Sequence, residues 1–213
     1  MKFLENAKAQ LIDYGCRMIS SRLTTGSGGN LSVYLRREDR LLITPSGMAY
    51  EQITPEDIVV CNGEGEVLQS RCSPSSEMGF HLALYRQRPE VTAVVHTHSV
   101  YATTLACMHR EIPPVHYLVG FSGSKVPLAP YATFGTASLA KAVARSIGDF
   151  NAILLANHGL VAIGKDLPTA FNVAEEIELV ARIYYQTLLA GEPKLLSAEQ
   201  MDEVLEKFKT YGQ

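Results

Sequence analysis

Several features common in other classes of protein are absent from this chain of 213 residues. It contains no tryptophan and only four cysteines, none of them in a C-x-x-C pair. A chain of this length needs no disulfide framework, so we expect free thiols in a reducing compartment. No apolar stretch approaches the roughly 20 residues that cross a bilayer, and the first residues turn polar too early for a signal peptide. We therefore expect a cytoplasmic protein with no membrane partner.

An excess of charge of one sign is also missing. The chain has 19 Lys and Arg against 22 Asp and Glu, a formal net charge of -3, and the basic residues form no stripe. Nucleic acids and anionic membranes are bound by clustered positive charge, so we expect neither as a partner. The phosphate loop G-x-x-x-x-G-K-S/T and a strand-linked G-x-G-x-x-G are absent too, which argues against nucleotide chemistry. A small phosphorylated substrate remains compatible.

The hydrophobic content of 46% is typical of a chain with one full core, and we expect a single domain over residues 1–213. Residue spacing predicts helices at 3–23, 77–88, 99–107, 137–147, 167–190 and 198–209. It predicts strands at 31–35, 41–44, 58–61, 91–96, 116–119, 152–156 and 160–163. This order is neither βαβ alternation nor a series of hairpins. It favours an α/β fold with a mixed, largely antiparallel central sheet covered by helices on both faces, a three-layer α/β/α sandwich.

Histidines at the ends of two predicted strands are the most informative feature of the sequence. His96 and His98 close one β-branched run, and side chains two apart on a strand share a face. His158 follows a second apolar run, and Glu77 comes earlier in the chain. Three imidazole nitrogens and one carboxylate oxygen suit Zn²⁺. The pattern therefore predicts a zinc site, although a histidine at a strand end is often only a hydrogen-bonded structural residue.

The other three histidines provide alternatives. His81 follows Glu77 by four residues on one helix face, so the two could form a ligand pair of their own. The apolar surroundings of His81, residues 80–84, favour packing in the core instead. We expect His109 to be solvated, and His116 either to be structural or to support the site.

Three turns rich in glycine and hydroxyl groups could bind an anion. They are Gly28-Gly29-Asn30, Ser46-Gly47 and Ser75-Ser76. Serines before a helix can act only as caps, and a glycine pair can simply end a helix, but the N–H groups of such turns also bind phosphate. No lysine lies in the apolar context that would favour a Schiff base. Activation of a carbonyl group would therefore depend on the metal.

In this order, these motifs resemble those of the class II sugar-phosphate aldolase and epimerase family. The similarity spans nearly the whole chain, at residues 28–32, 42–47, 74–77, 94–98, 114–117, 129–136, 157–160 and 206–212. The H-x-H and H-G-L motifs are specific to the family. Residues 131–136 and 206–212 resemble its fuculose-phosphate branch.

The resemblance implies a class II aldolase-like fold and a homotetramer with active sites between subunits. It implies one Zn²⁺ per subunit on His96, His98 and His158, with Glu77 as a fourth ligand or as a base that moves away. It implies that the phosphate is held by Gly29, Asn30, Ser46, Gly47, Ser75 and Ser76. Tyr117 of a neighbouring subunit would protonate the aldehyde oxygen, and the aldehyde pocket would be shaped by Phe134 and Tyr211.

The implied activity is reversible, zinc-dependent cleavage of L-fuculose 1-phosphate to dihydroxyacetone phosphate and L-lactaldehyde, a step of fucose degradation. A ribulose-phosphate 4-epimerase shares the metal and the bond cleavage, but its branch of the family carries aspartate at the position of Glu77. Another sugar-phosphate lyase of the family, such as a decarboxylase or dehydratase, remains an alternative. A non-catalytic scaffold like the adducin head lacks the metal-binding residues, which this chain retains.

Overall fold

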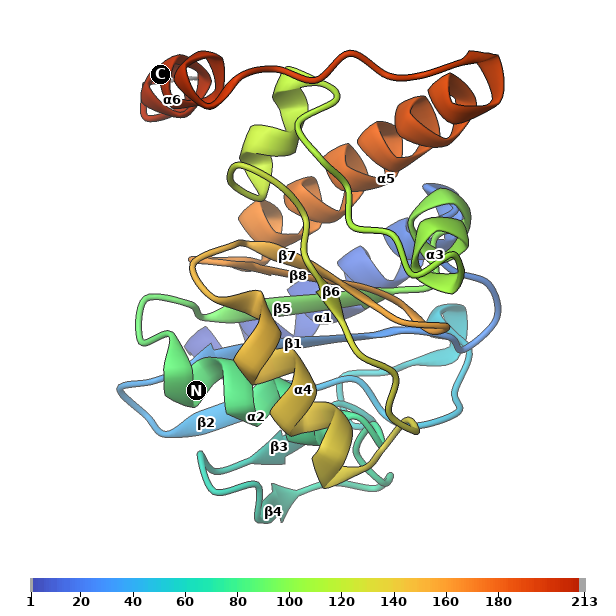
Figure 1. Ribbon diagram of the computed structural model, residues 1–213. Helices are drawn as coiled ribbons and strands as arrows, with labels where there is room; N and C mark the ends of the chain where they lie inside the picture. The colour runs from blue at the N-terminus through green and yellow to red at the C-terminus, as the bar shows by residue number, and fades with distance from the viewer. Residues whose placement is uncertain (1, 211–213) are drawn as a thin grey trace.

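A sheet of eight strands forms the middle layer of the computed structural model, which describes residues 2–210 (Figure 1). In space the strand order is β4-β3-β2-β1-β5-β8-β7-β6. Neighbouring strands are antiparallel except β6 and β7, which are parallel. The strands are β1 (Asn30–Leu35), β2 (Arg40–Ile43), β3 (Val59–Cys61), β4 (Val67–Gln69), β5 (Ala93–Thr97), β6 (Leu128–Ala129), β7 (Ala152–Leu155) and β8 (Gly159–Gly164). The mixed, largely antiparallel sheet predicted from the sequence is confirmed.

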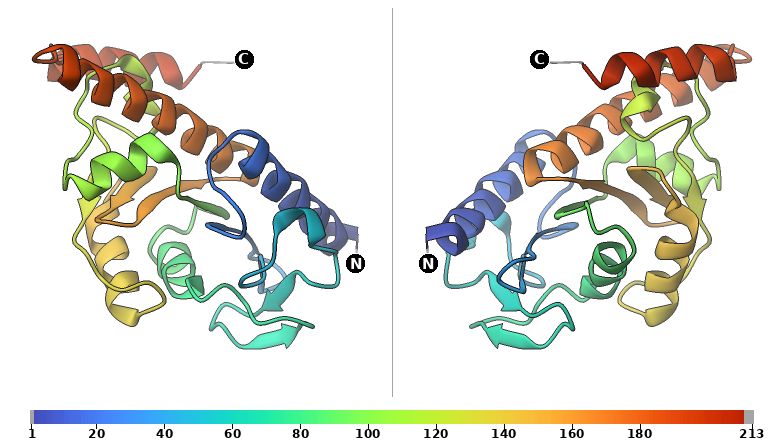
Figure 2. Two further views of the ribbon diagram at one scale, coloured as in Figure 1. Left: turned by 90° about the vertical axis from the view of Figure 1, so that its right-hand side faces the viewer. Right: turned by 90° about the vertical axis from the view of Figure 1, so that its left-hand side faces the viewer.

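Helices cover both faces of the sheet (Figure 2). On one face lie α1 (Lys2–Ser20), α3 (Val100–Cys107) and α5 (Leu167–Ala190), and on the other α2 (Met78–Gln87) and α4 (Ala137–Ile147). A short 3-10 helix, η1 (Tyr50–Gln52), packs on α1, while a second, η2 (Tyr117–Phe121), packs against α5 and α6 (Ala198–Phe208). The predicted three-layer arrangement is therefore also confirmed. Among the described residues, no helix is long and apolar enough to cross a membrane.

The alternation of side chains along β5 decides where the histidines lie. Ala93 and Val95 belong to the core under α1, α3 and α5, whereas Val94 belongs to the core under α2 and α4. His96 lies two residues after Val94 and so points to the same face. There its ring meets the edge of Phe80 on α2, with centroids 5.5 Å apart. The strand thus delivers His96 to the helix that follows Glu77.

The predicted strand at 116–119 is wrong, because these residues enter η2 instead. The side chain of His116 caps this 3-10 helix by accepting a hydrogen bond from the Leu118 N–H at 3.3 Å. The ring of Phe121 packs against Phe208 of α6, with centroids 4.9 Å apart and 42° between the planes. A local cap and a contact with the C-terminal helix therefore outweigh the apolar pattern of the segment. The sequence predicts that His116 either is structural or supports the site, and as the cap of this 3-10 helix it has a structural role.

Two strands were not predicted. The three residues of β4 are all exposed, so they carry no buried face that could produce an apolar pattern. The two residues of β6 lie between Pro127 and Pro130, and prolines usually argue against a strand. Both strands lie at the edges of the sheet, and they do not affect the position of the histidines.

Candidate active site and metal centre

Three adjacent strands bring the candidate ligands to one end of the sheet. Asn30, the first residue of β1, lies opposite His96 of β5, and His96 in turn lies opposite Val161 of β8. His98 follows the end of β5, and His158 occupies the turn between β7 and β8. The three histidines are therefore neighbours across the sheet although up to 62 positions separate them in the chain.

The nitrogens of His96, His98 and His158 form a cluster that could hold a metal ion, with the candidate ligand atoms all within 4.8 Å of one another. The Nε2 atoms of His96 and His98 are 3.1 Å apart. Glu77 completes the cluster, because its Oε2 lies 3.2 Å from His96 Nε2 and its Oε1 lies 3.2 Å from His158 Nε2. The structure thus brings together the four residues predicted to bind zinc.

Hydrogen bonding fixes which nitrogen of His96 faces the cluster. Its Nδ1 lies 2.9 Å from the carbonyl oxygen of Leu160, which can only accept, so Nδ1 carries the proton. In the neutral ring, Nε2 then presents a lone pair to the Glu77 carboxylate. Two lone pairs at this distance repel one another unless a proton or a cation lies between them. A histidine that donates its other N–H to a carbonyl is a common arrangement of metal ligands.

Glu77 occupies the N-cap position of α2 and is only 7% exposed. Its side chain makes no cap hydrogen bond, and the backbone N–H of Glu77 donates to Ser75 Oγ at 3.3 Å. Ser75 therefore supports the start of α2 from two residues before the N-cap Glu77, which corrects the expectation of a serine N-cap. The Glu77 carboxylate remains directed at the histidines, and its buried Oε1 accepts no hydrogen bond.

Burial and nearby charges act on the ionisation of this cluster. Burial raises the pKa of the Glu77 carboxyl, but the interactions of its two oxygens with the imidazoles of His96 and His158 outweigh burial and hold that pKa below its ordinary value. One side of the His98 ring is open to the cavity. Burial of the remainder, together with the charges of His96 and His158, lowers the pKa of His98 to about 4. His98 is therefore neutral at pH 7, as a metal ligand must be.

These features fit a divalent cation. The Nε2 atoms of His96 and His158 and the buried, unbonded Oε1 of the Glu77 carboxylate converge on one common point. Three imidazole nitrogens with one carboxylate oxygen form a donor set of the kind found in catalytic zinc sites. Several transition metals bind to the same donors. The ligand set therefore indicates a metal centre but does not identify the metal.

Two glycines allow the loops to approach this centre closely. Gly29 has φ +68°, and a Cβ there would lie 2.4 Å from the carbonyl oxygen of His96. A Cβ on Gly159 would lie 2.3 Å from the carbonyl oxygen of Thr97. Any larger residue would separate β1 or β8 from β5, and with them the turns that carry Asn30 and His158.

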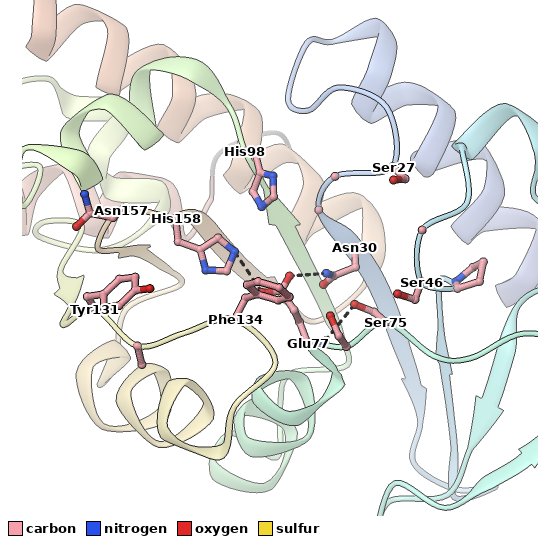
Figure 3. Close-up of a pocket in the computed structure, with 16 residues that line it drawn as sticks. Ser27, Asn30, Ser46, Ser75, Glu77, His98, Tyr131, Phe134, Asn157 and His158 are labelled. Carbon is pink, nitrogen blue, oxygen red and sulfur yellow. Dashed lines mark hydrogen bonds and ion pairs between the residues drawn. The ribbon is translucent and has the colours of Figure 1, made fainter.

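A cavity of about 390 Å³ opens beside the histidines. In Figure 3, Ser27, Ser46 and Ser75 lie on one side of it, and Tyr131 and His158 lie on the other. The turns at Ser46 and Ser75 are joined by backbone hydrogen bonds, from Ser46 N–H to Ser73 O (3.0 Å) and from Ser75 N–H to Thr44 O (3.2 Å). The cavity is lined by Ser27, Gly28, Gly29, Asn30, Pro45, Ser46, Gly47, Ser75, Ser76, Glu77, His98, Tyr131, Ala132, Phe134, Asn157 and His158.

Most of the predicted substrate-binding residues line this cavity. They include all six residues of the expected phosphate cup and Phe134. Tyr117 does not line it; its ring is 47% exposed and lies beside His116 and Phe208, on η2. Tyr211 lies outside the described residues. His96 is fully buried behind the cavity and faces it only through the cluster.

Several residues near the site were missed or misjudged from the sequence. His109 is exposed, as expected, but its Nε2 also bonds to Asn157 Oδ1 at 2.7 Å, and Asn157 lines the cavity with φ +55°. An asparagine before His-Gly is a signal for such a left-handed turn. His81 is in the core, as expected, but it is hydrogen-bonded on both ring nitrogens. Nothing in the local sequence identifies those two partners.

The fold, the histidine cluster and the cavity together define a class II aldolase. Residues 9–185 match the family described as class II aldolase and adducin N-terminal domain, and the chain belongs to this family. The protein is thus a lyase of the aldolase type.

Individual relatives extend over almost the whole chain. It is 48% identical over 210 residues to the 5-deoxy-D-ribulose 1-phosphate aldolase of Bacillus thuringiensis serovar kurstaki, covering 99% of each chain. It is 43% identical over 205 residues to the L-fuculose phosphate aldolase of Escherichia coli K12, covering 95% of this chain and 94% of the relative. A solved structure of an L-fuculose 1-phosphate aldolase matches with a TM-score of 0.94 at 42% identity, covering 96% of each chain.

Proposed function

We propose that this class II aldolase reversibly cleaves a ketose 1-phosphate into dihydroxyacetone phosphate and a short aldehyde that ends in a methyl group. The first candidate substrate is L-fuculose 1-phosphate, which would yield L-lactaldehyde and place the enzyme in fucose degradation. The observation that carries the proposal is the contact of Glu77 with His96 and His158 beside a cavity edged by three glycine- and serine-rich turns.

A second candidate substrate is 5-deoxy-D-ribulose 1-phosphate, which would yield acetaldehyde. It is favoured by the 48% identity to an aldolase named for that sugar, against 43% for the fuculose-phosphate enzyme. Both aldehydes end in a methyl group, and Tyr131, Ala132 and Phe134 give the cavity an apolar side. The two aldehydes differ by one hydroxyl-bearing carbon, which is present only in lactaldehyde.

The phosphate would bind at the turns opposite the aromatic residues. Gly29, Asn30, Ser46, Gly47, Ser75 and Ser76 line that part of the cavity. Ser75 and Ser76 directly precede Glu77, the N-cap of α2, and the N-terminus of a helix favours an anion through its dipole and its free N–H groups. We infer that these residues anchor the substrate and place the bond to be cleaved next to the histidines.

A Zn²⁺ ion, one per subunit, would be held by His96, His98 and His158, with Glu77 either as a fourth ligand or as a base that moves away from the metal. When bound, it supplies Lewis-acid stabilisation of the negative charge that develops on the ketose oxygens, which is worth several kcal/mol. The protein would keep the three imidazoles neutral and oriented. The Leu160 carbonyl does this for His96 by holding its Nδ1–H.

Proton transfers would be carried out by two side chains. In the direction of synthesis, the Glu77 carboxylate removes a proton from the hydroxymethyl carbon of dihydroxyacetone phosphate, and that carbon forms the new bond to the aldehyde carbon. Tyr117 of a neighbouring subunit donates its phenolic proton to the aldehyde oxygen, which becomes a hydroxyl group. Cleavage follows the same steps in reverse.

A neighbouring subunit is part of this proposal, because Tyr117 does not line the cavity of its own chain. We infer a homotetramer in which each active site lies between two subunits. Tyr211 is proposed to close the aldehyde pocket together with Phe134. The half-exposed Tyr117 and the exposed rings of Tyr131 and Phe134 are surfaces that such an assembly would cover.

The test is a panel of L-fuculose 1-phosphate, 5-deoxy-D-ribulose 1-phosphate, L-rhamnulose 1-phosphate and D-ribulose 5-phosphate. Release of dihydroxyacetone phosphate is followed with a coupled reductase, and the free aldehyde is trapped and identified. We expect the highest kcat/KM for one of the first two sugars. Conversion of a sugar phosphate into its epimer without free aldehyde would instead identify an epimerase and overturn the proposal.

A further inference from the structure

A chain of buried side chains runs from Glu77 away from the cavity. The Asn30 amide donates from Nδ2 to Glu77 Oε2 at 2.9 Å, and its Oδ1 lies 2.5 Å from His81 Nε2. On the other side of the ring, His81 Nδ1 lies 2.6 Å from Ser32 Oγ, which is 2.7 Å from the hydroxyl of Tyr85. Asn30 is 3% exposed, Tyr85 2%, and Ser32 and His81 are fully buried.

The charge of Glu77 determines the direction of every bond in this chain. An ionised carboxylate only accepts, so the NH2 group of Asn30 must face it and the amide oxygen must face His81. His81 then donates from Nε2, which leaves Nδ1 as an acceptor for the Ser32 hydroxyl. Tyr85 completes the order by donating to Ser32, either to Oγ or to the carbonyl oxygen at 3.1 Å.

We propose that His81 is a positioning residue for Glu77. Its Nε2–H holds the Asn30 amide in the one orientation that presents an N–H to the carboxylate, and so keeps Glu77 directed at the histidine cluster. The inference rests on the proposed role of Glu77 in proton transfer. It gives Asn30 a second task besides lining the phosphate side of the cavity.

The surroundings of His81 argue for this role over simple packing. Its ring stacks on Phe80 with centroids 4.7 Å apart and 19° between the planes, in a layer where an apolar residue would fill the same space. A fully buried imidazole is costly unless both nitrogens are bonded. Both are bonded here, and one of the two bonds leads through a single amide to Glu77. Without the Nε2–H, the Asn30 amide could rotate and place its oxygen against the carboxylate.

A matched pair of substitutions tests the proposal. His81→Gln keeps an N–H donor close to the position of Nε2, whereas His81→Met has nearly the same length and shape but no donor. We expect H81M to lower kcat tenfold or more, with KM changed less than threefold. H81Q should keep kcat within about threefold of the wild-type value. Equal loss in both variants, or a loss confined to KM, would show that His81 only fills space.

The wild-type protein provides a second readout that needs no variant. In ¹⁵N-histidine-labelled enzyme, the buried His81 ring should give one slowly exchanging N–H signal, with Nε2 protonated and Nδ1 unprotonated. A ring protonated at Nδ1 would reverse the chain of bonds and overturn the proposal. This measurement stands even if both substitutions prevent folding.

A double-mutant cycle separates this inference from the proposed role of Glu77. If His81 acts through Glu77, H81M should cost little further activity in an E77Q background, so the two effects should not add. Additive losses would contradict the positioning role of His81 and leave the proposed role of Glu77 unaffected. Full activity of E77Q by itself would instead contradict the role of Glu77 in proton transfer.

Discussion

His96 donates its Nδ1–H to the carbonyl oxygen of Leu160, with the two atoms 2.9 Å apart. Because β5 and β8 are paired through His96 and Val161, the strand pairing itself sets the orientation of the ring. The Nε2 atom is left facing His98 and Glu77 at 3.1 and 3.2 Å. The candidate metal centre thus lies where central strands of the sheet end, and its most buried ligand, His96, is held by the pairing of β5 with β8.

Removal of the metal should abolish activity and lower stability. We expect dialysis against a chelator to remove turnover, and one equivalent of Zn²⁺ per subunit to restore it. Because a ligand that binds only the folded state adds about 2.7 kcal/mol at a hundred times its Kd, zinc should also raise Tm. His98→Ala should weaken this zinc-dependent rise in Tm. Full activity in metal-free enzyme, verified by elemental analysis, would rule out a catalytic metal.

Replacing Glu77 by Gln should separate binding from proton transfer. The amide keeps the shape of the side chain but cannot accept a proton from the substrate carbon. We expect kcat to fall about a hundredfold or more, while zinc content and the affinity for inorganic phosphate stay nearly unchanged. Metal analysis and calorimetric titration with phosphate provide the controls. A variant with wild-type turnover would remove Glu77 from the mechanism.

Gly29 should tolerate alanine poorly because of its closeness to His96. A Cβ at this position would meet the His96 carbonyl oxygen at 2.4 Å, in addition to the strain of a positive φ. Gly26 is a matched control, since its φ is +61° and a Cβ there meets nothing within 4 Å. We expect Gly26→Ala to cost about 1 kcal/mol and Gly29→Ala about 2 kcal/mol more. Urea unfolding of both variants measures the difference.

The histidine cluster could be predicted from the sequence because its members lie where simple patterns end. His96 and His98 follow a β-branched run and His158 follows an apolar one, and an H-x-H spacing on a strand means a shared face. The edge strands β4 and β6 were missed since they carry no buried alternating face. The segment at Tyr117 was misassigned because its conformation depends on contact with Phe208, far along the chain.

The hydrogen bonds around His81 show why the rest of the site needed the structure. Asn30 and Ser32 lie on β1 and His81 lies on α2, so 51 and 49 positions separate the ring from these two partners. The apolar run at 80–84 predicts burial and contains no sign of a polar partner. Only the packing of α2 against β1 shows that this histidine is bonded through both nitrogens.

Acid should destabilise the protein partly through His81. Burial, and to a lesser extent the nearby imidazole of His96, lowers the pKa of His81 from 6.5 to about 3, while the charge of Glu77 opposes the shift. The unfolded chain binds this proton below about pH 6.5 and the folded chain does not, so stability falls as pH drops from 6.5 toward 3. In metal-free protein, the Tm of H81Q should fall less between pH 7 and pH 4 than the Tm of the wild type. Parallel profiles of Tm against pH for the two proteins would contradict the lowered pKa of His81.

Tyr117 should act in the active site of a neighbouring subunit, and mixed oligomers can test this directly. Tyr117→Phe removes the proton donor and Glu77→Gln removes the base, so each homo-oligomer should be nearly inactive. If the two residues of one site come from different subunits, random mixing of the variants creates some sites in which both are intact. Unfolding and refolding the two proteins together should then restore on the order of a quarter of wild-type activity.

The same experiment with a pair of residues from one chain supplies the control. Glu77→Gln mixed with His98→Ala should recover no activity, because both residues belong to the cluster of a single subunit. Size-exclusion chromatography with light scattering confirms that each mixture forms oligomers of the wild-type mass. Activity that returns in the mixture with Tyr117→Phe but not in the mixture with His98→Ala would show that the phenol of Tyr117 acts across the subunit interface. Failure of both mixtures, in oligomers shown to be mixed, would place Tyr117 in its own subunit's site or outside the reaction.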